Sequence, residues 1–107
     1  MSRNEKKVVE SFVEELRNRL GNEIIKIVLF GSKIRGDFGE ESDIDIFILV
    51  REKTSDIRDK VGDLTADYIF DNDIPLSPVL YDLFEYQKNK ELGSFFFENV
   101  EKEGISL

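Results

Sequence analysis

The sequence of 107 residues contains neither cysteine nor histidine. Without cysteine the chain cannot form disulfides or thiolate metal sites, and it has no thiol nucleophile. Without histidine it lacks the usual protein ligand of zinc and the commonest general base. Any chemistry that the chain performs must therefore use carboxylates, hydroxyls, lysine, arginine or bound hard cations.

Long hydrophobic runs are also missing. The longest, IVLF at residues 27–30 and IFILV at 46–50, are far too short to span a bilayer, and the polar start MSRNEKK lacks the apolar stretch of a signal peptide. The net charge of −8 opposes general attraction to nucleic acid or to an anionic membrane surface. We therefore expect a cytoplasmic protein that binds neither nucleic acid nor membrane.

The composition that is present suits a compact folded unit. The hydrophobic fraction of 40% is sufficient for a core, and the charged residues, 36% of the chain, include both signs, so wholesale disorder is not expected. A chain of 107 residues is large enough for one modest core and too small for a second. We therefore expect a single domain over residues 1–107.

The first half of the chain alternates helical and strand patterns. Apolar residues recur at helical spacing over residues 4–20, between a Ser2 N-cap and a Gly21 stop, and predict an amphipathic helix. The β-branched run at 24–30 and the run at 43–50 predict two buried strands. Between them lies a charged segment with three glycines, which is typical of a functional loop.

The second half begins with another predicted helix, from a Ser55 cap to about Phe70. Five of its residues are expected to face a core: Ile57, Val61, Leu64, Ala66 and Ile69. Residues 74–81 predict a third strand, and its two prolines favour an edge position because they lack amide donors. The long connection before it favours a parallel arrangement with the strand at 43–50.

Residues 82–103 complete the chain as helices, with a break at 92–94 where Gly93 acts as a stop and Ser94 as a new N-cap. The run SFFFENV at 94–100 contains three successive phenylalanines, which cannot share one helical face. They either pack into the core or are covered by a partner, and a second copy of the chain in a homo-oligomer is one option. The expected fold class is α/β, with a mixed three- to four-stranded sheet flanked by helices.

Two aspartates, Asp43 and Asp45, stand at the start of the second predicted strand. Residues i and i+2 of a strand point to the same face, so the two carboxylates project side by side while Ile44 and Ile46 fill the other face. Adjacent carboxylates repel each other, and a hard divalent cation relieves that repulsion. Because the ligands are oxygens alone, the pair is predicted to bind Mg²⁺ rather than zinc.

The Gly31–Ser32 turn after the first strand supplies a complementary feature. A glycine at the end of a buried strand lets backbone amides approach an anion closely, and Ser32 adds a hydroxyl donor. Lys33 and Arg35 follow in the same loop, where arginine can hold phosphate oxygens with two hydrogen bonds. A solvated loop charge is the alternative for both cations. If the two strands are neighbours, this phosphate cradle meets the carboxylate pair.

Residues 31–45, GSKIRGDFGEESDID, resemble the Gly-Ser, spacer, Gly, spacer, Asp-x-Asp signature of nucleotidyltransferases related to DNA polymerase β, especially their minimal, single-domain members. The resemblance extends over nearly the whole chain and implies a polymerase β-like nucleotidyltransferase fold. It implies that a nucleoside triphosphate, expected to be ATP, binds with Mg²⁺ as cofactor. It implies two catalytic, metal-binding carboxylates and three nucleotide-binding residues: Asp43, Asp45, Gly31, Ser32 and Arg35.

The same resemblance implies a protein partner. The minimal members are commonly partnered with a small helical HEPN protein, for which they act as antitoxin, and some transfer AMP to a tyrosine of that toxin. By resemblance, the chain is expected to be a Mg²⁺-dependent nucleotidyltransferase that transfers AMP from ATP to a hydroxyl of a HEPN-type partner in a toxin–antitoxin pair.

One position departs from the family pattern. Active members carry a third carboxylate near the start of the following strand, where this chain has Ser77. If the strand at 74–81 is parallel to its neighbour, Asp73 lies nearer to the site than Asp82 and is the better substitute. Two functions therefore stay open. The first, which we favour, is an active nucleotidyltransferase, and the second is a catalytically weak domain that neutralises a toxin by binding it.

Overall fold

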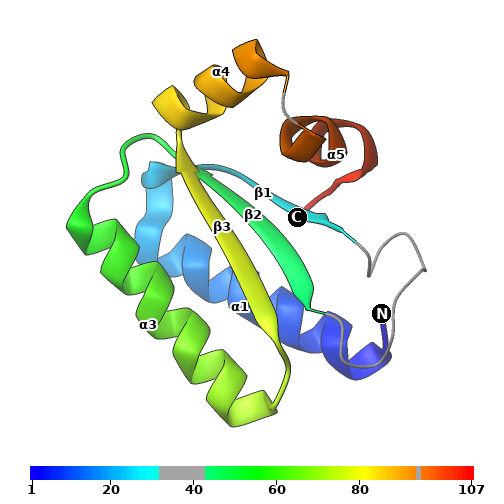
Figure 1. Cartoon of the computed structure of the whole chain (residues 1–107). Coiled ribbons are helices and arrows are strands. Elements are labelled where there is room, and N and C mark those ends of the chain that lie inside the picture. The colour runs from blue at the N-terminus through cyan, green and yellow to red at the C-terminus, as the bar shows by residue number, and fades with distance from the viewer. Residues whose placement is uncertain (32–42, 94) are drawn as a thin grey trace.

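The computed structural model describes residues 1–31, 43–93 and 95–107, without the side chains of residues 95–97 and 99. The elements follow in the order α1 (Arg3–Leu20), the short 3-10 helix η1 (Gly21–Glu23), β1 (Ile24–Phe30), β2 (Ile44–Val50), α3 (Ser55–Asn72), β3 (Leu76–Asp82), α4 (Leu83–Leu92), α5 (Phe95–Glu103) and β4 (Ile105–Ser106). They build one layered arrangement of helices and sheet (Figure 1).

The sheet has the strand order β3-β2-β1-β4. Strand β1 is antiparallel to both of its neighbours, β2 and β4, whereas β2 and β3 are parallel. The parallel pair is joined through α3, as a crossover connection requires. The predicted mixed sheet, the parallel third strand and its edge position are all confirmed.

Helix α1 begins and ends where its local sequence predicts. Ser2 Oγ accepts a hydrogen bond from the Glu5 amide at 3.1 Å, and the Glu5 carboxylate accepts one from the Ser2 amide at 2.9 Å. This capping box satisfies two amides that the helix leaves unpaired. At the other end Gly21 has φ 54°, and its amide bonds to the Arg17 carbonyl. The predicted cap and stop are both confirmed.

Helix α3 differs from its prediction at the cap and on its buried face. The N-cap is Thr54, whose hydroxyl accepts from the Ile57 amide at 3.2 Å, and Ser55 is the first helical residue. Ala66 and Ile69 are exposed, although both were predicted to face the core. Successive residues turn by about 100° in a helix, so the face that buries Ile57 directs these two positions toward solvent. The helix ends at Asn72, two residues later than expected.

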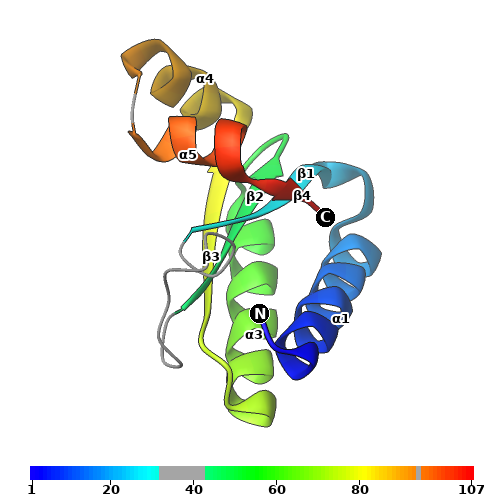
Figure 2. The same ribbon diagram turned by 90° about the vertical axis from the view of Figure 1, so that its right-hand side faces the viewer.

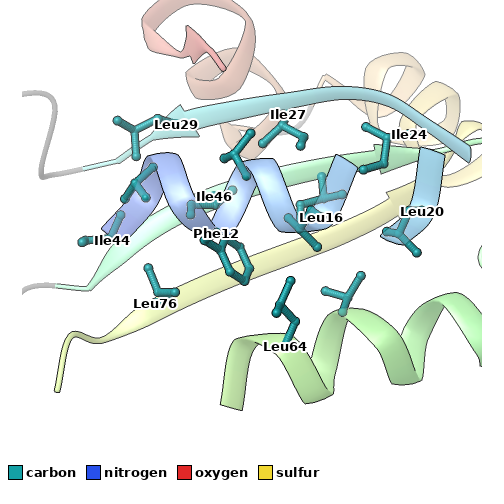
Figure 3. Close-up of a cluster of buried hydrophobic side chains, with 14 of the residues drawn as sticks. Phe12, Leu16, Leu20, Ile24, Ile27, Leu29, Ile44, Ile46, Leu64 and Leu76 are labelled. Atoms are coloured by element: carbon teal, nitrogen blue, oxygen red, sulfur yellow. The ribbon is translucent and has the colours of Figure 1, made fainter. Parts of the chain in front are cut away.

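The main core lies between the sheet and the helices α1 and α3, which run side by side on one face (Figures 1 and 2). Figure 3 shows that this cluster draws side chains from both helices and from β1, β2 and β3. Ile44, Ile46 and Ile48 of β2 belong to it and are fully buried. Alternation along the strand then directs Asp45 and Phe47 to the opposite face.

That opposite face carries a second buried cluster, made of Val28, Phe30, Phe47, Leu49 and Val100. Val100 comes from α5, so the C-terminal helix covers part of this face. The predicted helix break is confirmed at Gly93, which ends α4 with φ 63°, whereas Ser94 and the phenylalanine side chains lie outside the described part. Strand β4 was not predicted, because two residues are too short to show a strand period.

Candidate active site

The end of β1 and the start of β2 meet at one end of the sheet. Phe30 is the register partner of Asp45, and the next residue after Phe30 is Gly31. Ile44 donates its amide to the Pro75 carbonyl at 2.8 Å, which ties the first residue of β2 to the segment that enters β3. The predicted meeting of the Gly-Ser turn with the carboxylate strand is therefore confirmed for Gly31 and Asp45.

Gly31 is buried and has φ 89°, a conformation that L side chains rarely adopt. A Cβ atom added to Gly31 would lie 3.0 Å from Cγ of Asp45 and 3.2 Å from its Cβ, and it would overlap the carboxylate oxygen Oδ2. Only glycine therefore lets the backbone approach this carboxylate so closely. The requirement for glycine comes from both its positive φ and its contact with Asp45.

The two aspartates differ in their surroundings. Asp45 is half-buried within β2, whereas Asp43 precedes the strand and is exposed. Asp43 and Asp45 lie four and two residues before Phe47, which is on the face opposite the main core. Because alternate residues of an extended strand share a face, both aspartates are directed to that same face. Such a pair fits Mg²⁺, which is usually held by one or two carboxylates together with substrate phosphates. The remaining coordination positions of the ion would be left for water and phosphate oxygens.

The neighbouring strand places a hydroxyl beside Asp45. Ser77 of β3 is the register partner of Asp45, and both residues are half-buried. Asp82 lies at the far end of β3, opposite Val50, where its carboxylate accepts from the Glu85 amide at 2.9 Å and caps α4. Asp82 is thus a structural residue away from the site, in line with its position in a parallel strand.

Asp73 lies at the same end of the sheet as Asp43 but in a distinct role. It has φ 52°, and its amide bonds to the Ile69 carbonyl at 2.9 Å, so it forms the C-cap of α3. Within the described ranges, no three acidic side chains come close enough together to hold a metal ion. A third carboxylate beside Asp43 and Asp45 is therefore not found in that part of the chain.

Comparison with known proteins identifies the family. Residues 9–107 match the family model described as "Nucleotidyltransferase domain". The chain belongs to this family and is a nucleotidyltransferase.

Two relatives come from Methanocaldococcus jannaschii, and both are named "putative protein adenylyltransferase". One is 31% identical over 101 residues, which cover 94% of this chain and 95% of the relative. The other is 37% identical over 110 residues, which cover 97% of this chain and 98% of the relative.

The fold has a counterpart among solved structures. A crystal structure described as that of a "putative nucleotidyltransferase" from Sulfolobus solfataricus superposes with a TM-score of 0.56 at 23% identity. The match covers 94% of this chain and 76% of the other. The agreement concerns the fold: an α/β architecture with a mixed sheet flanked by helices.

Of the five predicted site residues of this nucleotidyltransferase, three lie in the described structure and two fall outside it. Gly31 and Asp45 are in contact, and Asp43 stands two positions before Asp45. Ser32 and Arg35, the predicted phosphate-binding residues, lie outside the described residues, so their roles stay predictions.

A second polar cluster was not singled out from the sequence. Ser11 and Glu15 of α1 meet Tyr68 of α3 through hydrogen bonds on the helical side of the sheet. The two helices are separated by two strands, so hydrophobic periodicity could not pair these residues. The available signal was the spacing of Ser11 and Glu15, four residues apart on one helix face.

Proposed function

We propose that the chain transfers a nucleotidyl group, AMP from ATP, to a hydroxyl of a protein partner, with Mg²⁺ as cofactor. The observation that carries the proposal is the contact of Gly31 with Asp45, with Asp43 at the mouth of the same strand. It brings a backbone suited to anions beside a carboxylate pair suited to a hard cation. Membership of the nucleotidyltransferase family supports this pairing of nucleotide and metal.

In this proposal Asp43 and Asp45 hold the metal, and amides after Gly31 together with Ser32 and Arg35 hold the triphosphate. Bound Mg²⁺ supplies charge neutralisation at the phosphates and at the transferring phosphorus. The acceptor hydroxyl gives up its proton to water, and its oxygen forms a bond to the α-phosphorus. The bond from that phosphorus to the oxygen that bridges it to the β-phosphorus breaks, and pyrophosphate leaves. The exposure of Asp43 and the half-burial of Asp45 suit a site that opens toward a large acceptor.

The acceptor is proposed to be a protein because the two archaeal relatives carry the name "putative protein adenylyltransferase". The further proposal, a HEPN-type helical protein in a cytoplasmic toxin–antitoxin pair, rests on the resemblance of residues 31–45 to minimal nucleotidyltransferases. Among the described residues, no helix has the length and apolar character needed to cross a membrane.

A second candidate function is an interaction protein that neutralises a toxin mainly by binding it. The observation that favours this candidate is Ser77, which takes the place beside Asp45 where active members are expected to carry a carboxylate. A hydroxyl cannot serve as the base for the acceptor, and base catalysis contributes roughly 10²- to 10⁴-fold to rate. Transfer would then be slow, although nucleotide and partner could still bind.

Label transfer separates the two candidates. The purified chain is incubated with α-phosphate-labelled ATP, Mg²⁺ and a HEPN protein from the same organism. The double variant Asp43→Asn/Asp45→Asn tests the site, and Asp59→Asn/Asp63→Asn, at two exposed positions of α3, is the control with the same change in charge. We expect the HEPN protein to be labelled by the wild type and the control but not by the site variant.

Two other outcomes would change the conclusion. If no protein is labelled while the chain still captures the HEPN protein, the binding function replaces the enzymatic one. If the site variant labels the acceptor as well as the wild type does, Asp43 and Asp45 are not the metal ligands, and the site proposed for this activity is wrong.

A further inference from the structure

Tyr68 of α3 has a hydroxyl held between two polar groups of α1. Its oxygen lies 2.6 Å from Ser11 Oγ, and it donates a hydrogen bond to Glu15 Oε1 at 2.9 Å. A phenol carries a single proton, so donation to Glu15 makes Ser11 the donor in the other bond. Glu15 binds Arg19 through its second oxygen, Oε2, at 3.3 Å. The tyrosine oxygen is therefore positioned against a carboxylate that can accept its proton.

The ring of Tyr68 is fixed, and space is open beside it. Phe12 meets the ring edge-on, with centroids 5.4 Å apart. The cavity next to Tyr68 has a volume of about 410 Å³, within the range of small-molecule sites, and its lining includes Lys7, Asp71 and Asn4. It opens between the N-terminal part of α1 and the C-terminal part of α3. A phosphodiester formed on Tyr68 would have room there and a lysine in the lining to meet its charge.

The other two of the chain's three tyrosines have different surroundings. Tyr81 and Tyr86 pack on the second cluster, on the opposite face of the sheet. Tyr86 accepts a hydrogen bond from Lys26 Nζ at 3.3 Å. The ring of Tyr81 lies edge-on against that of Phe47, with the ring centroids 5.6 Å apart. Tyr68, on the side of the sheet that carries α1 and α3, donates its proton to a carboxylate at the rim of an open cavity.

We propose that Tyr68 is a self-modification site, which accepts a nucleotidyl group from the active site of a second copy of this chain. This inference rests on the function proposed above. The phenolic oxygen forms a bond to the α-phosphorus of the bound triphosphate, its proton moves to Glu15, and pyrophosphate leaves. The product is a phosphodiester that carries one negative charge. ATP supplies the transferred group, so no further reactant is required.

Proton removal by Glu15 is needed because the phenol keeps its proton at neutral pH. Burial raises the pKa of Tyr68 above the ordinary 10.0, an effect to which the hydrogen bond with Glu15 adds and which the bond with Ser11 opposes. Glu15 is therefore a positioning and proton-accepting residue for this reaction.

The transfer must occur between two molecules. Tyr68 packs against the main core, on the side of the sheet that carries α1 and α3 (Figure 2). Asp45 belongs to the face opposite, since its neighbours Ile44 and Ile46 fill the main core. The sheet therefore lies between the acceptor oxygen and the carboxylate pair of one chain. A second copy can present its Asp43 and Asp45 to this surface from outside.

A mixing experiment tests the proposal on full-length chains. Wild-type chain carrying a size tag is mixed with untagged Asp43→Asn/Asp45→Asn chain, a HEPN protein from the same organism, α-labelled ATP and Mg²⁺. The untagged chain keeps Tyr68 but lacks its own carboxylates, so label on it must come from another molecule. We expect label at Tyr68 by peptide mass mapping, no label when Tyr68→Phe is added to the double variant, and about 100-fold less when Glu15→Gln is added. Tyr86→Phe in the same background is the matched control and is expected to keep the label.

Three results would overturn the inference. Equal labelling with and without Tyr68→Phe would place the acceptor elsewhere. Label on a HEPN protein but on neither copy of this chain would refute self-modification and leave the proposed function standing. An absence of label on every protein would refute both. Circular dichroism of each variant excludes unfolding as the cause of a lost signal, because Phe retains the ring contact with Phe12 and Gln retains an acceptor for the tyrosine.

Discussion

Gly31 lies against the carboxyl group of Asp45, so closely that a Cβ atom on Gly31 would stand 3.0 Å from Cγ of Asp45. The contact joins the residue after β1 to the second residue of β2. In the sequence, Gly31 and Asp45 are separated by the whole glycine-rich loop. Backbone and carboxylate therefore constrain each other. A change at Gly31 must move Asp45, and this coupling can be measured without knowing the acceptor.

Substitution Gly31→Ala is expected to lower both stability and magnesium affinity. The positive φ of 89° and the overlap with Asp45 Oδ2 should cost at least about 1–3 kcal/mol in the free energy of unfolding. Urea unfolding measures the loss, and calorimetric titration with Mg²⁺ and a non-hydrolysable triphosphate measures the affinity.

Gly62→Ala is the matched control for that measurement. Gly62 lies inside α3 with nothing within 4 Å of an added Cβ. Alanine should therefore stabilise the chain by about 0.5–1 kcal/mol and leave magnesium affinity unchanged. Equal effects at the two glycines would show that the contact of Gly31 with Asp45 does not constrain the site.

A second prediction concerns the core. Phe12 is fully buried between α1, α3 and the sheet, so Phe12→Ala should cost about 3–5 kcal/mol in the free energy of unfolding. Phe84 of α4 is 73% exposed and lies outside the buried core. Lys88 Nζ lies 5.7 Å from the centroid of the Phe84 ring, a cation–π contact at an exposed site, so Phe84→Ala should cost less than about 1 kcal/mol. Urea unfolding of both variants checks the contrast. Because surface changes usually cost no more than about 1 kcal/mol, a cost above about 2 kcal/mol at Phe84 would contradict the prediction.

The parts of the fold that local sequence determines were predictable. The Ser2 cap, the Gly21 stop and the strand Ile24–Phe30 agree with the structure because each depends on nearby residues or on a short run of β-branched apolar residues. The alternation in β2 likewise predicted the face of Asp45. The Ala66 error arose because a small apolar residue shows little preference for either face of a helix.

Other features depend on contacts between distant segments. Strand β4 forms because Ile105 pairs with Leu29 and Ser106 pairs with Val28. No local sequence pattern predicts a strand of two residues. The bond of Tyr68 to Glu15 joins positions 53 residues apart. Such pairings follow from how the helices pack on the sheet, so a single sequence cannot reveal them.

The Tyr68 hydroxyl gives a prediction on pH. Burial raises its pKa above 10.0 in the folded state, so above pH 10 the unfolded chain releases this proton more readily than the folded chain does. Tyr68 therefore favours unfolding as the pH rises through that range and has no such effect below it. The difference in unfolding free energy between wild type and Tyr68→Phe should be constant from pH 7 to about 9. At higher pH the wild type should lose stability relative to Tyr68→Phe. A difference that stays constant up to pH 11 would contradict the raised pKa.

Ser77 provides the last prediction, on the chemistry of the site. Because Ser77 is the register partner of Asp45, Ser77→Asp places a third carboxylate on the strand beside it. Such a group can hold metal or accept the proton of the acceptor hydroxyl, so the rate of label transfer should rise at least about tenfold. Asp73→Asn is the comparison, since asparagine tolerates the left-handed backbone that Asp73 adopts with φ 52°. If Asp73 supplies no carboxylate to the site, this variant transfers label at the wild-type rate. A loss of transfer in Asp73→Asn, together with no gain in Ser77→Asp, would assign the third carboxylate to Asp73 and leave Ser77 without a catalytic consequence.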